Sequence, residues 1–164
     1  MKTLAIACVA LLAGAAGFAA DDMNVQADPK ADFASFKTFN LRNTSITSER
    51  PELDNRLFEK KLTSTIRTAL VQRGLKEVSS NPDLIVDYAL TNEDVATTQR
   101  GYRAGPLPVR YTVGMLVIDM FRLGVPAPVW RGVCRDDEST GSKLVVKLPE
   151  DAQKLIAKYP KLGR

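Results

Sequence analysis

Histidine is absent from the 164 residues, and cysteine occurs only twice, at Cys8 and Cys134. The absence of histidine excludes Ser-His-Asp and Cys-His catalysis, zinc sites that use histidine, and the usual proton shuttle near neutral pH. The phosphate-binding GxxxxGK loop and the dinucleotide-binding glycine pattern are also missing from the sequence. We therefore expect a protein that is not an enzyme and that holds no cofactor and no metal ion.

Long apolar runs are scarce, and the one at the N-terminus is short and rich in alanine. Lys2 gives a positive start, residues 4–17 are uncharged, and small residues close the segment before Asp21. This three-part pattern is typical of a secretory signal, and Gly17 and Ala19 place the cleavage after Ala19. We therefore expect residues 1–19 to be a cleavable signal and the mature protein to be periplasmic or secreted.

Two other interpretations of the N-terminus stay open. A retained anchor would need about 20 strongly apolar residues, whereas this run is shorter and consists mostly of alanine and glycine. A lipid attached to Cys8 would leave too few apolar residues before the cysteine to form the core of a signal. We expect neither lipidation at Cys8 nor a transmembrane span in the mature chain.

The mature chain, residues 20–164, is long enough for one domain with its own core. Loss of Lys2 with the signal lowers the formal net charge from +4 to +3, which is compatible with loose attraction to anionic surfaces. Cys134 is then the sole thiol, so an internal disulfide is excluded. We expect Cys134 to be a small buried hydrophobe on a strand, with a reactive thiol as the alternative.

Apolar periodicity predicts five strands and two helices. The strands are expected over 23–27, 37–41, 84–90, 109–121 and 129–134, with loops over 42–50, 92–108 and 136–142. The first helix should start near Pro51, bury one face and end at Gly74; that face comprises Phe58, Leu62, Ile66, Ala69 and Leu70. The second should open at Pro149, with its apolar side formed by Ala152, Leu155, Ile156 and Tyr159. The order β-β-α-β-β-β-α predicts an α+β two-layer sandwich, a mainly antiparallel sheet with both helices on one face.

Four segments, in this order, resemble motifs of one bacterial envelope family, called domain of unknown function 4136. They are Asp32–Phe39, Gly114–Asp119, Val129–Gly132 and Leu155–Pro160. The resemblance covers nearly the whole mature chain and implies an exported α+β protein, often a lipoprotein, with no established activity. This sequence departs from the family at the lipid-bearing cysteine. The family supplies no catalytic residues to carry over.

Three residues on the predicted strands are expected to have structural roles. Asp119 ends an apolar strand and Arg131 lies on the strand expected beside it, so a cross-strand ion pair is predicted. The alternative makes Asp119 a general base or a ligand. Trp130 is expected to pack in the core or on the sheet, the alternative being an aromatic platform for a sugar or a peptide.

A cluster of basic and aromatic residues around the expected 92–108 loop is the candidate ligand-binding site. It consists of Arg100, Tyr102, Arg103, Arg110 and Tyr111. Such a mixture can bind nucleic acid by charge and stacking, but export makes nucleic acid an unexpected partner. Phospholipid headgroups, lipopolysaccharide phosphates and acidic peptides are better candidates, and a merely mobile loop is the alternative.

The sequence as a whole predicts a non-enzymatic envelope protein that acts by binding or assembly. Because two helices can cover only one side of the sheet, a face or an edge is expected to be left for a partner, either an envelope protein or an anionic envelope component. One alternative is a small-molecule or lipid carrier with a pocket between helix and sheet. Another is a hydrolase that uses a carboxylate pair drawn from Asp87, Asp119 and residues 136–138.

Overall fold

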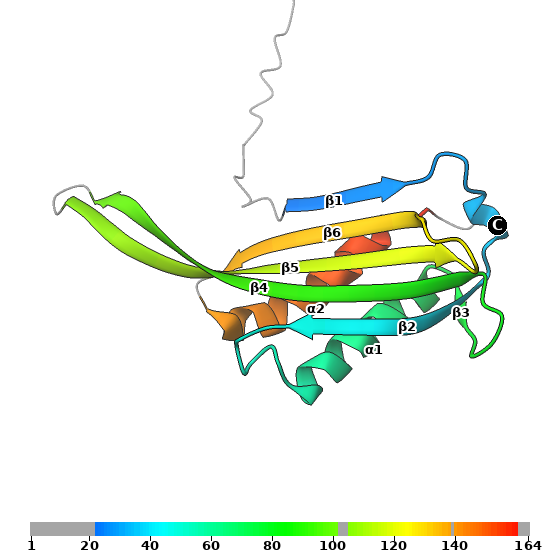
Figure 1. The fold of residues 1–164 in the computed structure, drawn as a ribbon, viewed down its shortest axis with the longest axis horizontal. Helices are drawn as coiled ribbons and strands as arrows, with labels where there is room; N and C mark the ends of the chain where they lie inside the picture. The colour runs from blue at the N-terminus through cyan, green and yellow to red at the C-terminus, as the bar shows by residue number, and fades with distance from the viewer. Residues whose placement is uncertain (1–21, 102–104, 139, 161–164) are drawn as a thin grey trace, which may run out of the picture.

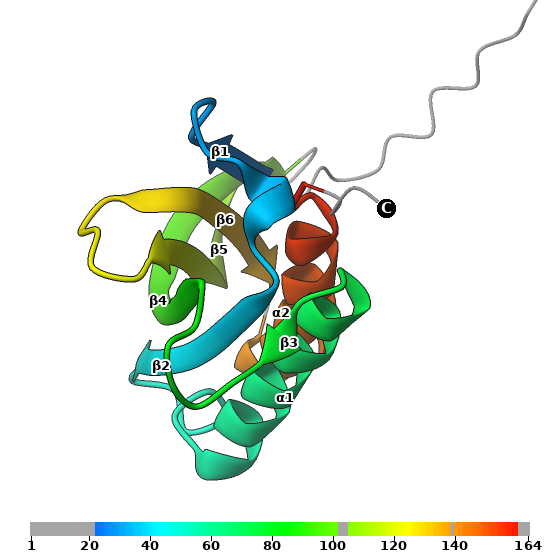
Figure 2. The ribbon, with the colours of Figure 1, turned by 90° about the vertical axis from the view of Figure 1, so that its right-hand side faces the viewer.

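The computed structural model describes residues 22–101, 105–138 and 140–160, and for residues 43–45, 95–101, 105–111 and 138 it describes the backbone alone. One sheet and two helices form two layers, with both helices on the same side of the sheet (Figures 1 and 2). The predicted α+β sandwich is therefore confirmed. The elements along the chain are β1 (Asp22–Ala27), the 3-10 turn η1 (Phe33–Ser35), β2 (Thr38–Thr47), α1 (Arg56–Gln72), β3 (Lys76–Glu77), β4 (Leu84–Gly101), β5 (Gly105–Arg122), β6 (Pro128–Glu138) and α2 (Gly141–Ala157).

The sheet in the described part of the chain has six strands in the order β1-β6-β5-β4-β2-β3. The pairs β1–β6, β6–β5 and β5–β4 are antiparallel. The pairs β2–β4 and β2–β3 are parallel, so the sheet is mixed. The parallel part arises because α1 lies between β2 and the next two strands, and a helical crossover returns the chain in the same direction.

Helix α1 buries the predicted stripe, Phe58, Leu62, Ile66, Ala69 and Leu70. Its start was predicted too early. Residues 51–55 form turns instead, because Asn55 provides the N-cap: its side chain accepts a hydrogen bond of 2.9 Å from the N–H of Phe58. Gly74 has φ +95°, so the glycine that closes the helix adopts the left-handed conformation that the sequence predicted.

The prediction of a loop over 92–108 is wrong. Strands β4 and β5 continue in register up to the pair Gly101–Gly105, forming a two-stranded ribbon that projects beyond the helices (Figure 1). The segment is polar but contains several β-branched residues, among them Val95, Thr97 and Thr98, and such residues favour strands. We call residues 94–112 the ribbon.

Other element boundaries also differ from the prediction. β2 extends to Thr47 and β6 to Glu138, so much of the expected loops at 42–50 and 136–142 is strand, and the short strand β3 was missed. Helix α2 begins at Gly141, and Pro149 lies inside it. A proline in a helix interior is unfavourable by about 3 kcal/mol, but Leu144 and Leu148 continue the apolar face of the helix and are fully buried. Their burial offsets the proline.

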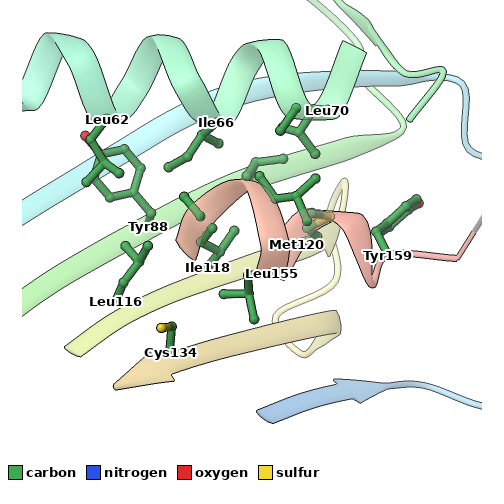
Figure 3. Packing of buried hydrophobic residues seen from close by; sticks show 14 of the residues in the cluster. Leu62, Ile66, Leu70, Tyr88, Leu116, Ile118, Met120, Cys134, Leu155 and Tyr159 are labelled. Atoms are coloured by element: carbon green, nitrogen blue, oxygen red, sulfur yellow. The ribbon is translucent and has the colours of Figure 1, made fainter. Parts of the chain in front are cut away.

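The core fills the space between the helices and the sheet. Figure 3 shows side chains of α1, such as Leu62, Ile66 and Leu70, above those of β4 and β5, with Leu155 and Tyr159 entering from α2 and the segment that follows it. Cys134 is fully buried among them, as the sequence predicted. In the described ranges, no helix is both long and apolar enough to cross a membrane. The predicted signal lies outside the described residues.

Candidate binding face

The sheet has one face without helices, which we call the open face. Side chains alternate between the two faces of a strand; Leu84, Val86, Tyr88, Leu116 and Ile118 point to the helices and are buried. Their neighbours, which pair across the strands, therefore belong to the open face. These residues are Ile85, Asp87, Ala89, Thr91 and Glu93 of β4, Val113, Met115, Val117, Asp119 and Phe121 of β5, and Arg131, Val133, Arg135 and Asp137 of β6.

An apolar line runs along β5 on the open face. It comprises Val113, Met115, Val117 and Phe121, interrupted by Asp119. Ala89 and Val133 flank Val117 in register and widen the line. Met115 is 41% exposed, Val117 and Phe121 are half-buried, and Val113 is buried. Both faces of β5 are thus apolar in the body of the sheet, although helices cover only one of them.

A row of charges crosses this line. The guanidinium of Arg131 donates two hydrogen bonds to Asp119, Nε to Oδ1 at 2.6 Å and Nη2 to Oδ2 at 2.7 Å. The hydrogen bonds and the charge of Asp119 raise the pKa of Arg131 above its usual value. Asp87 stands opposite Asp119 in register, and its own cationic neighbour, Arg42, lies 4.0 Å away (Nη2 to Oδ2). The predicted Asp119–Arg131 pair is therefore present, and a second carboxylate adjoins it.

Two hollows lie at opposite ends of the open face. The first, of about 350 Å³, adjoins the turn between β5 and β6, and we call it the turn hollow; it is lined by Arg42, Ile85, Asp87, Phe121, Arg122, Gly124, Val125 and Pro126. The second, of about 300 Å³, lies near the base of the ribbon and is lined by Thr91, Asn92, Glu93, Val113, Met115 and Arg135. A third, of about 450 Å³, lies between the end of β2 and the ribbon, lined by Thr47, Ser48, Glu49, Asn92, Glu93 and Asp94.

A polar cluster fixes the base of the ribbon on the other face. The Nη2 of Arg50 donates to both carboxylate oxygens of Asp94 at 2.8 Å, and Thr112 donates to the same carboxylate at 3.0 Å. These contacts raise the pKa of Arg50 above its usual value, chiefly through the hydrogen bonds with Asp94. No local pattern in the sequence indicates this cluster, because its members lie far apart in the chain.

The structure brings part of the predicted basic and aromatic cluster onto the ribbon. In register, Arg100 pairs with Pro106, Arg110 with Ala96, and Tyr111 with Val95. Tyr102 and Arg103 lie outside the described residues. The ligand-binding role of the cluster stays a prediction.

Trp130 lies in the core rather than on the surface. It is fully buried, and its ring makes an edge contact with Tyr159 at a centroid distance of 6.0 Å. Burial and the positive charge of Arg73 act in opposite directions on Tyr159; burial is the larger effect and raises the pKa of the phenol well above its usual value. This position of Trp130 leaves no free aromatic surface for stacking a ligand.

The remaining candidate carboxylates do not gather around Asp87 and Asp119. Asp136 is buried on the helix side, where the Nζ of Lys147 lies 3.5 Å from its Oδ2, whereas Asp137 lies on the open face beside Val113. That register position lies six positions along β5 from Asp119, a distance of about 20 Å along the strand. Within the residues that the structure describes, no group of three or more His, Cys, Asp and Glu side chains could hold a metal ion.

Comparison with known proteins places the chain in a family. The family model DUF4136, a domain of unknown function, matches residues 23–161. A solved structure of a DUF4136 family protein from Bacteroides thetaiotaomicron is similar with a TM-score of 0.59 and 17% identity, over 85% of this chain and 96% of that chain. A PDZ domain protein from Parabacteroides distasonis is similar with a TM-score of 0.57 and 14% identity, over 88% of this chain but 36% of that chain. No curated protein matches the sequence.

Proposed function

This chain belongs to the DUF4136 family, and we propose that it is an exported envelope protein that binds a protein partner through its open face and catalyses no reaction. The observation that carries the proposal is the apolar line along β5 on a face that no helix covers. Apolar side chains that gather on an uncovered surface mark interaction sites in many soluble proteins.

Two arginines of the open face form ion pairs within the face, which favours binding of a protein partner. Arg131 is bound to Asp119 by two short hydrogen bonds, and Arg135 pairs with Asp137 at 3.3 Å (Nε to Oδ1). When a partner binds and excludes water, charged groups that are already paired have a smaller free-energy cost of desolvation than single solvated charges. The face is therefore suited to a partner that is largely apolar where it meets β5.

The two alternatives have weaker support. A carrier needs an internal pocket, whereas none of the three hollows is lined by the residues of the core cluster. A carboxylate hydrolase could use Asp87 and Asp119, which stand opposite each other. However, both carboxylate oxygens of Asp119 already accept short hydrogen bonds from Arg131, which engages one of the two carboxyl groups that such a hydrolase needs.

The ribbon offers a second contact for an anionic component of the envelope. Arg100 near the end of β4 and Arg110 in the first half of β5 both belong to the ribbon, which extends beyond the helix layer (Figure 1), and arginine is well suited to phosphate. Replacing Arg100 and Arg110 by glutamine should weaken binding to anionic vesicles if this contact exists. Equal binding of the variant and the parent protein would remove the ribbon from the proposal.

The main test places a photo-crosslinking amino acid on the open face, at Thr91, in the mature protein and exposes it to envelope extracts. We expect a discrete crosslinked species that disappears when Met115→Glu introduces a charge into the apolar line. Val146→Glu is the matched control, because Val146 is 56% exposed on the outer side of α2. Crosslinking that is unaffected by Met115→Glu, or equally lost in Val146→Glu, would contradict the proposal.

A further inference from the structure

The turn hollow combines an apolar floor with two cationic walls. Ile85 and Phe121, paired in register at the end of the open face, supply the floor. Arg42 on β2 and Arg122 at the end of β5 supply the cations. We propose that the turn hollow binds an amphiphilic anion, a phosphate or carboxylate group joined to an apolar chain.

The two guanidinium groups are only lightly engaged by the protein. Arg42 has one ion pair, to Asp87 at the long distance of 4.0 Å. By contrast, Arg131 on the same face forms two hydrogen bonds to Asp119, at 2.6 and 2.7 Å. Among the described residues, the side chain of Arg122 has no hydrogen bond or ion pair. Since a guanidinium carries five N–H donors, both arginines can still bind an incoming anion.

The rim of the hollow is apolar where a surface turn is usually polar. Val125 in the turn after Arg122 is 39% exposed, and Gly124 adopts φ +79°, which a tight turn at this point requires. Pro126 completes the rim. A ligand whose anionic group binds the arginines would cover Val125, Ile85 and Phe121 with its apolar chain. Such a ligand explains why the rim of the hollow is apolar.

The size of the hollow limits the ligand. Its volume of about 350 Å³ lies at the lower end of the roughly 300–1,000 Å³ that is usual for ligand sites. It can accommodate an anionic headgroup and the first carbons of a chain but not a whole lipid. The ligand can therefore be a free amphiphile or the exposed part of a lipid in a bilayer.

The test measures binding of dodecyl phosphate, below its micelle concentration, to the mature protein by titration calorimetry. Inorganic phosphate supplies the charge alone and dodecyl maltoside the chain alone. We expect dodecyl phosphate to bind more tightly than either. Because hydrogen bonds to charged groups are among the stronger ones, Arg42→Gln and Arg122→Gln should each weaken binding about tenfold.

Arg56→Gln is the matched control, because it removes the same charge from an exposed position on α1, on the other side of the sheet. Equal loss in Arg56→Gln, or equal affinity for all three probes, would overturn the proposal. Vesicles of phosphatidylglycerol in phosphatidylcholine then distinguish the sources: binding that depends on Arg42 and Arg122 identifies a bilayer lipid, and binding of dodecyl phosphate alone identifies a free amphiphile.

Anion binding at the turn hollow does not depend on the proposed binding of a protein partner. Met115 lies near the opposite hollow, so Met115→Glu should abolish crosslinking and leave binding of dodecyl phosphate unchanged. Arg122→Gln should have the reverse effect. The experiments can therefore contradict the protein partner or the anion site separately.

Discussion

Gly132 on β6 occupies a position without room for a side chain. A Cβ built there would lie 2.6 Å from Cη2 of Trp130 and 2.7 Å from Cγ of Leu155, so the glycine allows α2 to pack against the tryptophan. We predict that Gly132→Ala lowers the free energy of unfolding by about 1–3 kcal/mol, because the tryptophan and the leucine must both move. Urea denaturation of the mature protein measures the change.

The loss of stability in Gly132→Ala can be compared with that in Gly114→Ala. A Cβ at Gly114 would lie 3.2 Å from Cδ2 of Leu144, the end of a side chain that can shift by a few tenths of an ångström. The loss should be smaller than for Gly132→Ala. Equal stability of Gly132→Ala and the parent protein would contradict the packing described here.

Arg131 offsets the repulsion between two neighbouring carboxylates, Asp119 and Asp87. Without it, Asp119 would face Asp87 directly across the strands, and like charges in that position are destabilising. We predict that Arg131→Gln lowers the free energy of unfolding by about 0.5–1 kcal/mol and that adding Asp87→Asn restores part of the loss. Thermal or urea unfolding of the four variants of the cycle measures this coupling; strictly additive effects would show that the two aspartates do not interact.

At the level of elements, Asp83 joins the starts of β2 and β4. Its Oδ2 accepts hydrogen bonds from the N–H of Lys37 and from the N–H and the hydroxyl of Thr38. The bond from Lys37 contributes most to lowering the pKa of Asp83 below 3.8, its ordinary value. The ionised Asp83 therefore contributes its full stabilisation of the fold at pH values above 3.8, and this contribution is lost as the pH falls through the lower pKa of the folded state.

Asp83→Asn should show this dependence. The variant keeps an acceptor but loses the charge, so its urea midpoint should lie below that of the parent protein at pH 7. The difference should shrink as the pH is lowered below about 4 and through the folded-state pKa, because Asp83 becomes protonated over this range and then carries no charge, as asparagine does. A difference that is constant from pH 7 to pH 3 would contradict the role assigned to the carboxylate.

The first half of α2 provides another prediction. Leu148 precedes Pro149 and is fully buried, so Leu148→Ala should lower the free energy of unfolding by about 2–5 kcal/mol. Val146→Ala, at an exposed position of the same turn, should change it by less than about 0.5 kcal/mol. Chemical denaturation distinguishes this helix from one that opens only at Pro149, as the sequence predicted, because the two substitutions would then have similar small effects.

These elements show which parts of the fold could be predicted. The predictions of a helix with its apolar stripe from Phe58 to Leu70 and of a strand over 84–90 were correct. In each segment, the residues that face the core recur with a regular period. The ribbon was missed because its strands are stabilised by pairing with each other, which a polar local sequence does not reveal. The start of α2 was missed because Pro149 is a strong local signal that tertiary packing overrides.

At the scale of the whole molecule, the signal predicted over residues 1–19 leads to a prediction about location. We predict that expression of residues 1–164 in a Gram-negative host yields a periplasmic species with the mass of residues 20–164. Mass spectrometry of the intact protein measures this, and Cys8→Ala should leave mass and location unchanged. A mass increased by a lipid, or retention of the first 19 residues in the membrane, would favour one of the alternatives for the N-terminus.

The open face also belongs to this scale, and the sequence predicted it only in outline. Two one-sided helices implied that a face would be left uncovered, and this was correct. The alignment of Val117 with Ala89 and Val133, and the turn hollow that Arg42 and Arg122 share, depend on strand register and on a β-bulge after Leu41. Such long-range alignments have no signal in a single sequence.

The first and the last strand of the described chain lie side by side at one edge of the sheet: β1 pairs with β6, and Asp22 stands opposite Arg135. A chain that is exported with its N-terminus first delivers β1 long before β6 emerges. This edge can therefore close only when translocation is nearly complete, and contacts between such distant residues slow folding. In a chain translocated in this order, the delay favours passage in the unfolded state, and until β1 docks, the edge of β6 keeps unpaired N–H and C=O groups with which another strand can pair.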